Sequence, residues 1–148
     1  MSAKSKGKAL HRQLSRSRSL RPYLLSALRI AVALSFLTHG TQKLFSWPVS
    51  QARPVADMLT QTWFAGVLET FGGLLMLLGL FTRPVGFILS GQMAVAYFQA
   101  HAPRGFWPIL NGGELASIYC FLWLYFATAG AGPFSLDAVL FKRSSEDR

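Results

Sequence analysis

Four runs of mostly apolar residues, separated by short polar segments, constrain this chain of 148 residues more than any other feature. They cover residues 23–45, 63–81, 85–101 and 114–131. A helix needs roughly 20 apolar residues to cross the hydrocarbon core of a bilayer. The sequence therefore predicts an all-α membrane protein: an antiparallel bundle of four transmembrane helices, with a proline-containing turn at residues 82–84 between the second and third.

The distribution of charge divides the chain into three parts. Residues 1–22 are expected to form a basic, disordered cytoplasmic tail, residues 23–140 the membrane domain, and residues 141–148 a short polar C-terminal tail. Only 14% of the residues are charged, against about 25% in soluble domains. Because the positive charge gathers in a tail rather than over a folded surface, the expected partner is the lipid bilayer and not nucleic acid.

The basic tail has two alternative interpretations. A cleaved signal peptide is disfavoured, because no A-x-A-like site closes the first apolar run. The tail is also rich in Arg and Ser and contains no acidic residue, which is the composition of an organelle presequence. The favoured role is topological, because Lys and Arg next to a membrane span hold that end in the cytoplasm.

The asymmetry of Lys and Arg predicts the orientation. Both termini and the 82–84 turn are expected in the cytoplasm, and the 46–62 and 102–113 loops outside. Arg29 lies near the cytoplasmic end of the first run, where its side chain is expected to reach the headgroups. Three tryptophans fall at the outer boundary, where an aromatic belt is expected: Trp47, Trp63 and Trp107.

Polar residues of all four runs are expected to converge near the outer boundary. A charged side chain in hydrocarbon costs roughly 3 kcal/mol on insertion scales, so each one needs a partner or a wet cavity. His39 and Lys43 share one face of the first helix, and Glu69 lies about 9 Å below the outer end of the second. The other members of this group lie at the ends of the third and fourth runs and in the loop between them: His101, Arg104, Asn111 and Glu114.

This convergence leaves two alternatives open. The groups could merely neutralise one another, Glu69 with Lys43 or a histidine and Glu114 with Arg104. They could instead line a pocket for a small polar or redox ligand. Two histidines and two carboxylates could also bind a metal ion, but no Glu-x-x-His pair of the kind found in di-iron bundles is present. We therefore expect no metal site. The single cysteine, Cys120, excludes an internal disulfide.

Several ordered motifs between Leu24 and Leu140 resemble those of the DoxX family. The first run closes on HGTQKLF, and the second carries a Glu followed by FGG. Further motifs lie in the turn and in the outer loop. In order along the chain the segments are residues 39–45, 69–73, 79–84, 93–98, 101–108, 111–114 and 130–137.

The resemblance implies a small four-helix protein of the bacterial inner membrane, crossing it several times. Members of this family have been linked to quinone-coupled oxidation of sulfur compounds and to complexes that handle thiol or oxidative stress. The family motifs map onto eight polar residues of this chain: His39, Gln42, Lys43, Glu69, His101, Arg104, Asn111 and Glu114. We therefore expect a redox-associated subunit that binds a quinone or a small thiol-related ligand in an outer-side pocket.

In this hypothesis Glu69 and His39 are the catalytic proton acceptor and donor, and the other six residues bind the ligand. The sequence contains no haem or iron–sulfur cysteine pattern. Electron transfer would therefore need the quinone as a non-covalent cofactor, other subunits of a membrane complex, or both, and a homo-oligomer is compatible with the sequence. The alternatives are a non-catalytic scaffold or assembly factor and, less favoured, a small transporter.

Overall fold

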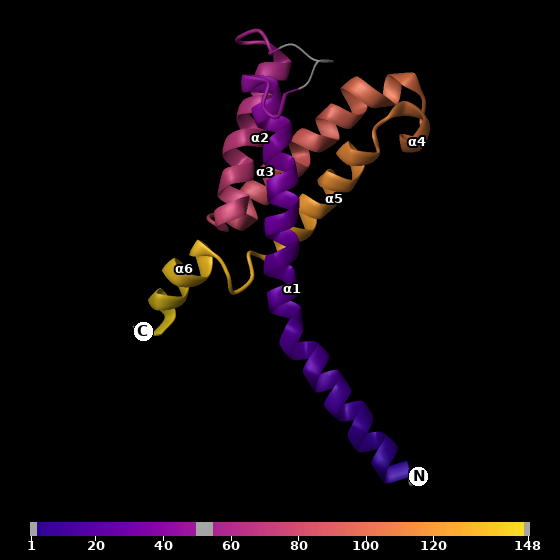
Figure 1. Cartoon of the computed structure of the whole chain (residues 1–148), viewed down its shortest axis with the longest axis vertical. Helices are drawn as coiled ribbons and strands as arrows, with labels where there is room; N and C mark the ends of the chain where they lie inside the picture. Colours follow the sequence, from indigo (N-terminus) through magenta and orange to yellow (C-terminus); the bar gives the residue numbers. More distant parts are fainter. Residues whose placement is uncertain (1–2, 50–54, 147–148) are drawn as a thin grey trace.

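The computed structural model describes the backbone of residues 3–49 and 55–146 and the side chains of residues 20–49 and 55–141. These residues form helices and loops with no strand among them, which confirms the all-α prediction. The described backbone contains, in order (Figure 1), α1 (Ala3–Phe45), α2 (Gln61–Leu78), α3 (Thr82–Ala96), a π-helical turn (Tyr97–His101), a 3-10 turn (Ala102–Arg104), α4 (Pro108–Asn111), α5 (Glu114–Ala129) and α6 (Leu136–Glu146).

The hydrophobic core forms where α1, α2, α3 and α5 meet. α1 packs along α2, α3 packs along α5, and the two pairs touch through α2 and α3. Each of these helices contributes to a single buried cluster, which includes Phe36, Met76, Leu89 and Trp123. In Figure 1 the C-terminal end of α1 and all of α4 lie at one end of this core, whereas α6 lies toward the other.

α1 and α5 bury residues at alternating intervals of three and four. In α1 the buried positions are 26, 29, 33, 36 and 40, and in α5 they are 116, 119, 123 and 126. This spacing keeps one face of each helix directed at its neighbours. Glycine on that face permits close approach, because a Cβ at Gly40 would lie 2.5 Å from the backbone nitrogen of Thr70.

The turn between α2 and α3 lies earlier in the chain than the predicted break at residues 82–84. Gly79 ends α2 in the left-handed conformation, with φ of 66°. Pro84 instead lies in the first turn of α3, where proline is tolerated because the N–H that it lacks would have no helical acceptor. The carboxylate of Asp137 in α6 accepts hydrogen bonds from the N–H groups of Phe81 and Thr82, at 2.7 and 2.9 Å, and so caps α3.

The expectation that Arg29 reaches the headgroups is wrong, because its side chain is fully buried. Its guanidinium donates to the carbonyl oxygens of Met76 and Leu77 at the end of α2, and to those of Ala131 and Phe134 after α5. The last carbonyls of a helix have no partner within the helix and carry partial negative charge. Arg29 satisfies them and ties three segments of the chain together.

The division of the chain into two tails and a membrane domain stays a prediction. Residues 3–22 are drawn as the N-terminal part of α1, and Figure 1 shows this part projecting beyond the other helices. The segment is rich in Leu, Lys and Arg, which favour helix. At the other end, residues 141–146 belong to α6. Residues 1–2 and 147–148 of the predicted tails lie outside the described backbone.

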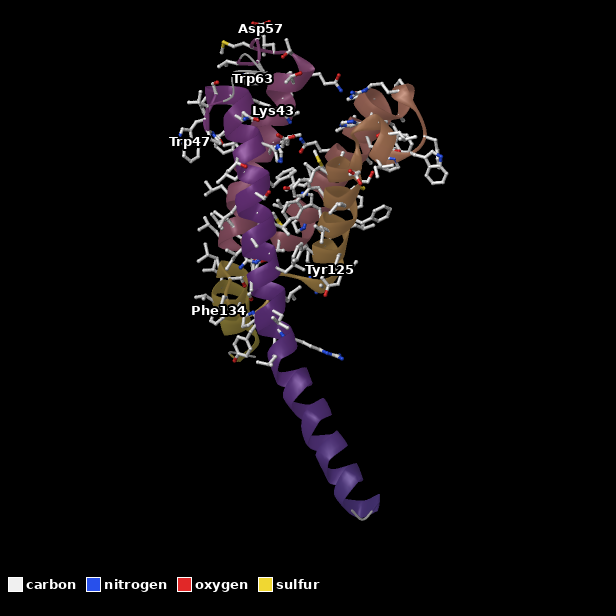
Figure 2. The ribbon with its side chains drawn as sticks, turned by 45° about the vertical axis from the view of Figure 1, so that its right-hand side comes forward. Lys43, Trp47, Asp57, Trp63, Tyr125 and Phe134 are labelled. Carbon is white, nitrogen blue, oxygen red and sulfur yellow. The ribbon has the colours of Figure 1, made fainter. Side chains whose placement is uncertain are left out.

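Two segments of the described chain are long and apolar enough to cross a bilayer, Leu20–Phe45 in α1 and Gln61–Leu78, which is α2. α5 is a shorter apolar helix. The predicted third run is not one regular helix, because α3 gives way to the π-helical turn at Tyr97. Figure 2 places Trp47 and Trp63 at the same end of the molecule as Asp57, and Tyr125 and Phe134 nearer the opposite end.

Candidate functional site

The centre of the candidate site is an ion pair between α1 and α2. The ammonium of Lys43 donates to Glu69 Oε1. The same oxygen accepts a hydrogen bond from Gln92 Nε2 of α3, at 3.2 Å. Glu69 is only 2% exposed, so its charge lies where the attraction to Lys43 is only weakly screened.

The other carboxylate oxygen has a different environment. Glu69 Oε2 is buried and makes no hydrogen bond with any group that the structure describes. Buried polar atoms in proteins are nearly always paired, so an exception needs an explanation. Gln92 Oε1 and Thr70 Oγ1, from the same region, are also buried and unpaired with respect to the described groups. The region therefore contains two acceptor oxygens and one hydroxyl that the described groups leave without a hydrogen bond.

Glu69 and Lys43 lie on the wall of a cavity of about 210 Å³, which we call the central cavity. Residues of α1, α2, α3, α5 and the π-helical turn line it, among them Phe36, His39, His101 and Tyr119. The ring of Tyr119 lies edge-on to Phe36, with centroids 5.1 Å apart, and its hydroxyl donates to Ser35 Oγ at 2.7 Å. The cavity thus combines aromatic walls with a partly buried ion pair.

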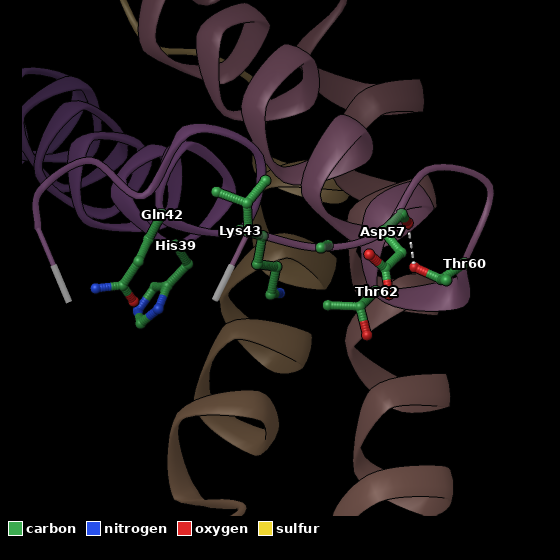
Figure 3. A pocket seen from close by; sticks show the side chains of 8 residues that line it. His39, Gln42, Lys43, Asp57, Thr60 and Thr62 are labelled. Carbon is green, nitrogen blue, oxygen red and sulfur yellow. Dashed lines mark hydrogen bonds between the residues drawn. The ribbon is translucent and has the colours of Figure 1, made fainter. Parts of the chain in front are cut away.

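A second cavity, of about 370 Å³, lies between the C-terminal end of α1 and the segment that leads into α2. We call it the loop-side cavity. Figure 3 shows His39, Gln42 and Lys43 from α1 on one side, and Asp57, Thr60 and Thr62 on the other. His39 and Lys43 also line the central cavity. The two side chains therefore lie at the boundary between the cavities.

The loop beyond the π-helical turn is held by Asn111, which is 2% exposed. Its amide donates to the carbonyl of Gly105 at 2.7 Å, and its side-chain oxygen accepts from the N–H of Gly113 at 2.8 Å. Its own carbonyl lies 3.2 Å from His101 Nδ1. These contacts tie His101, which lines the central cavity, to the start of α5.

Five of the eight predicted site residues are gathered at the two cavities: His39, Gln42, Lys43, Glu69 and His101. Asn111, the last residue of α4, contacts one of them, because its carbonyl oxygen lies beside His101 Nδ1. Arg104 is exposed and donates to the carbonyl of Ala100, at 2.7 and 3.1 Å. The predicted pairing of Glu69 with Lys43 is present.

Glu114 is not part of this group. Its side chain is exposed and lines neither cavity. The alternative that pairs it with Arg104 fails, since the ion pair found among the described side chains is that of Lys43 and Glu69. The reason is the face of α5 on which Glu114 lies. The buried face of α5 begins at Ala116, and position 114 is not on it.

Three residues of the site are absent from the sequence-based prediction: Gln92, which hydrogen-bonds Glu69, and Tyr119 and Asp57, which line the central and the loop-side cavity. Gln92 lies one residue before the buried Met93, which places it at the edge of the inward face of α3. Tyr119 occupies a buried position of α5 with the three–four spacing, which was a usable signal. Asp57 had no comparable signal, because it lies in a connecting segment without periodicity.

Comparisons with known proteins agree with this organisation. The DoxX family model matches residues 24–102, which include α2, α3 and the membrane part of α1. An uncharacterized protein from Haemophilus influenzae is 49% identical over 129 residues, which cover 83% of this chain and 95% of that relative. No solved structure matches the chain. The family match over more than half of the sequence shows that this chain belongs to the DoxX family of membrane proteins.

Proposed function

We propose that the chain is a multi-pass protein of the bacterial inner membrane whose four core helices span the bilayer with both termini in the cytoplasm. The shared core of α1, α2, α3 and α5 supports this arrangement, since each helix buries one face against the others. The positive charge of the N-terminal segment supports the orientation. In this orientation the two cavities face the outer side of the membrane.

We further propose that the central cavity binds a small redox-active ligand, a quinone headgroup or a small thiol-related molecule. The observation that carries this proposal is the ion pair of the buried Glu69 with the partly buried Lys43 on the wall of a cavity, with one oxygen of Glu69 unpaired among the described groups. Ionisable groups inside a membrane protein are uncommon and mark functional sites more often than not. A volume of about 210 Å³ is below the roughly 300–1,000 Å³ of sites for larger ligands, so the ligand is small or inserts one ring.

Each group has a role that follows from its chemistry. Lys43 and His39 donate hydrogen bonds to a ligand oxygen, and Glu69 accepts a hydrogen bond or a proton from the ligand. Phe36 and Tyr119 provide aromatic surface against a ring. The loop-side cavity gives protons a route toward solvent past Lys43. Electrons pass between the ligand and a partner subunit, so the chain acts as the ligand-binding subunit of a redox complex.

The test is calorimetric titration of the purified protein in lipid nanodiscs. The titrants are a short-chain benzoquinone, in oxidised and reduced form, and a small alkyl thiol. We expect saturable binding of at least one of them at one site per chain. The His39→Ala variant should bind about tenfold more weakly, which is the effect of one hydrogen bond of about 1.4 kcal/mol. Glu114→Gln is the matched control and should bind as the wild type does.

The competing function, a non-catalytic scaffold for a membrane complex, predicts a different result. A scaffold would bind none of these titrants, and substitutions at the cavity would change only the recovery of partner proteins. Absence of binding by the wild-type protein would therefore refute the redox-ligand proposal and favour the scaffold. Equal binding by the His39→Ala variant would remove His39 from the site.

A further inference from the structure

We infer that the central cavity selects its ligand in the hydrogen-bond-donating form, so that a hydroquinone binds in preference to the corresponding quinone. This inference rests on the proposed function and narrows it to one chemical state of the ligand. It follows from the balance of donors and acceptors on the cavity wall. The oxidised and reduced rings have nearly the same shape, but the quinone carries only acceptors and the hydroquinone carries two O–H donors.

The first step concerns the two oxygens of Glu69. Oε1 receives hydrogen bonds from Lys43 and Gln92, whereas Oε2 is buried without a partner among the described groups. A carboxylate paired with an ammonium accepts hydrogen bonds and has none to donate. Only a donor can therefore satisfy Oε2, and a quinone carbonyl next to it would place two acceptors together.

The second step concerns Gln92, whose amide orientation is fixed by its neighbours. Its Nε2 lies 3.3 Å from the carbonyl oxygen of Ala65 and 3.2 Å from Glu69 Oε1. Both neighbours are acceptors, so the nitrogen must be on that side and the oxygen on the other. Gln92 Oε1 is then a second buried and unpaired acceptor. Gln92 thus stabilises Glu69 Oε1 and supplies no donor to Oε2.

Gln92 lies behind Glu69 rather than on the wall, whose other polar side chains are the donors Lys43 and His39 together with Tyr119 and His101. The hydroxyl hydrogen of Tyr119 is directed to Ser35 Oγ. His101 Nδ1 lies 3.2 Å from the carbonyl oxygen of Asn111 and 3.4 Å from Arg104 Nη2, so this nitrogen is engaged outside the cavity. Lys43 keeps N–H groups beyond the one directed at Glu69. A hydroquinone satisfies both sides, because one hydroxyl donates to Glu69 Oε2 and the other accepts from Lys43.

The experiment compares three ligands that share one ring: a short-chain benzoquinone, its hydroquinone kept reduced without oxygen, and the dimethyl ether of that hydroquinone. Binding to the wild-type protein in nanodiscs is measured by calorimetry. We expect the hydroquinone to bind at least about tenfold more tightly than the quinone, since a hydrogen bond to a charged group has at least that effect. The ether keeps the ring and loses both donors, so it should bind as weakly as the quinone.

Two variants locate the effect. Glu69→Gln should bring the affinity ratio of hydroquinone to quinone close to one, because its amide offers a donor and an acceptor. Glu114→Gln changes an exposed carboxylate outside the cavity and should keep the wild-type ratio. A quinone or an ether that binds wild-type protein as tightly as the hydroquinone overturns the inference and leaves the proposed function standing. Failure of all three ligands to bind overturns the proposed function itself.

Discussion

Replacement of Arg29 by methionine should destabilise the fold more than any other single substitution at the end of the molecule opposite the cavities. Methionine keeps a long unbranched side chain but has no hydrogen to donate. Four carbonyl oxygens lose a donor, and one of these bonds, from Nε to Ala131, measures 2.9 Å. The link between the end of α2 and the segment after α5 is thereby lost.

The size of the effect follows from two opposing contributions. Each buried carbonyl that loses its partner costs about 1–3 kcal/mol. Removal of the buried charge relieves part of its desolvation penalty, so the costs do not simply add. We expect a net loss of about 3–5 kcal/mol of stability, the range measured when a buried charged contact is broken from one side. For a domain of this size that corresponds to a fall of roughly 10 °C in Tm.

The single cysteine provides the assay. Cys120 is partly buried in α5, beside Ser90, so a thiol-reactive fluorescent dye reports unfolding during a thermal ramp in detergent. Arg29→Lys keeps the charge without the planar fork and should melt between the wild type and Arg29→Met. Arg83→Gln, at an exposed position, is the control and should shift Tm by no more than about 2 °C. If Arg29→Met melts with the wild type, the structural role assigned to Arg29 is wrong.

Three further substitutions test other contacts by the same thermal assay. Lys43→Met should lower the free energy of unfolding by about 3 kcal/mol, because it leaves the buried carboxylate of Glu69 without its cation. Adding Glu69→Gln in the same chain should recover most of that loss. If the losses of the two single variants simply add in the double variant, the pairing is contradicted. Asp137→Ala removes the cap of α3 and should cost about 1 kcal/mol, and an unchanged Tm would show that the cap is dispensable. Gly40→Ala places a Cβ 2.5 Å from a backbone nitrogen of α2 and should cost about 1–3 kcal/mol. Gly91→Ala has no atom within 4 Å of its new Cβ and should raise stability by up to about 1 kcal/mol, because alanine favours helix more than glycine does.

The sequence predicted the helices and part of the site because both depend on local pattern. Apolar length and proline placement indicated four helical segments, and these coincide with α2, α3, α5 and the C-terminal part of α1. His39 and Lys43 were predicted to share a face from their spacing, and both line the two cavities. The depth of Glu69 followed from the antiparallel order of α1 and α2, which brings it within reach of Lys43.

The errors at Arg29 and Glu114 share one physical origin, the rotation of each helix about its axis. The prediction that Arg29 reaches the headgroups uses only its depth along the first run. The residue lies on the helix face that also carries the buried Ser26, Ala33 and Phe36. Those intervals of three and four residues would have predicted an inward side chain. Glu114 was likewise judged by depth, and it points away from the core.

Other features depend on contacts between distant segments, which local pattern does not encode. The cap that Asp137 supplies to α3 joins residues 55 and 56 positions apart in the chain. The four carbonyls bound by Arg29 lie 47 to 105 positions away from it. The α2–α3 turn could have been placed correctly, because Gly79 is a common helix-ending residue and proline is common in a first helical turn.

The most direct test of the ligand site is an experimental structure of the protein in nanodiscs, saturated with the hydroquinone. The account predicts the ring inside the cavity bounded by Phe36 and Tyr119, with one hydroxyl within hydrogen-bond distance of Glu69. A ring bound elsewhere on the protein, with Lys43 and Glu69 closed upon each other and no space beside them, would contradict it.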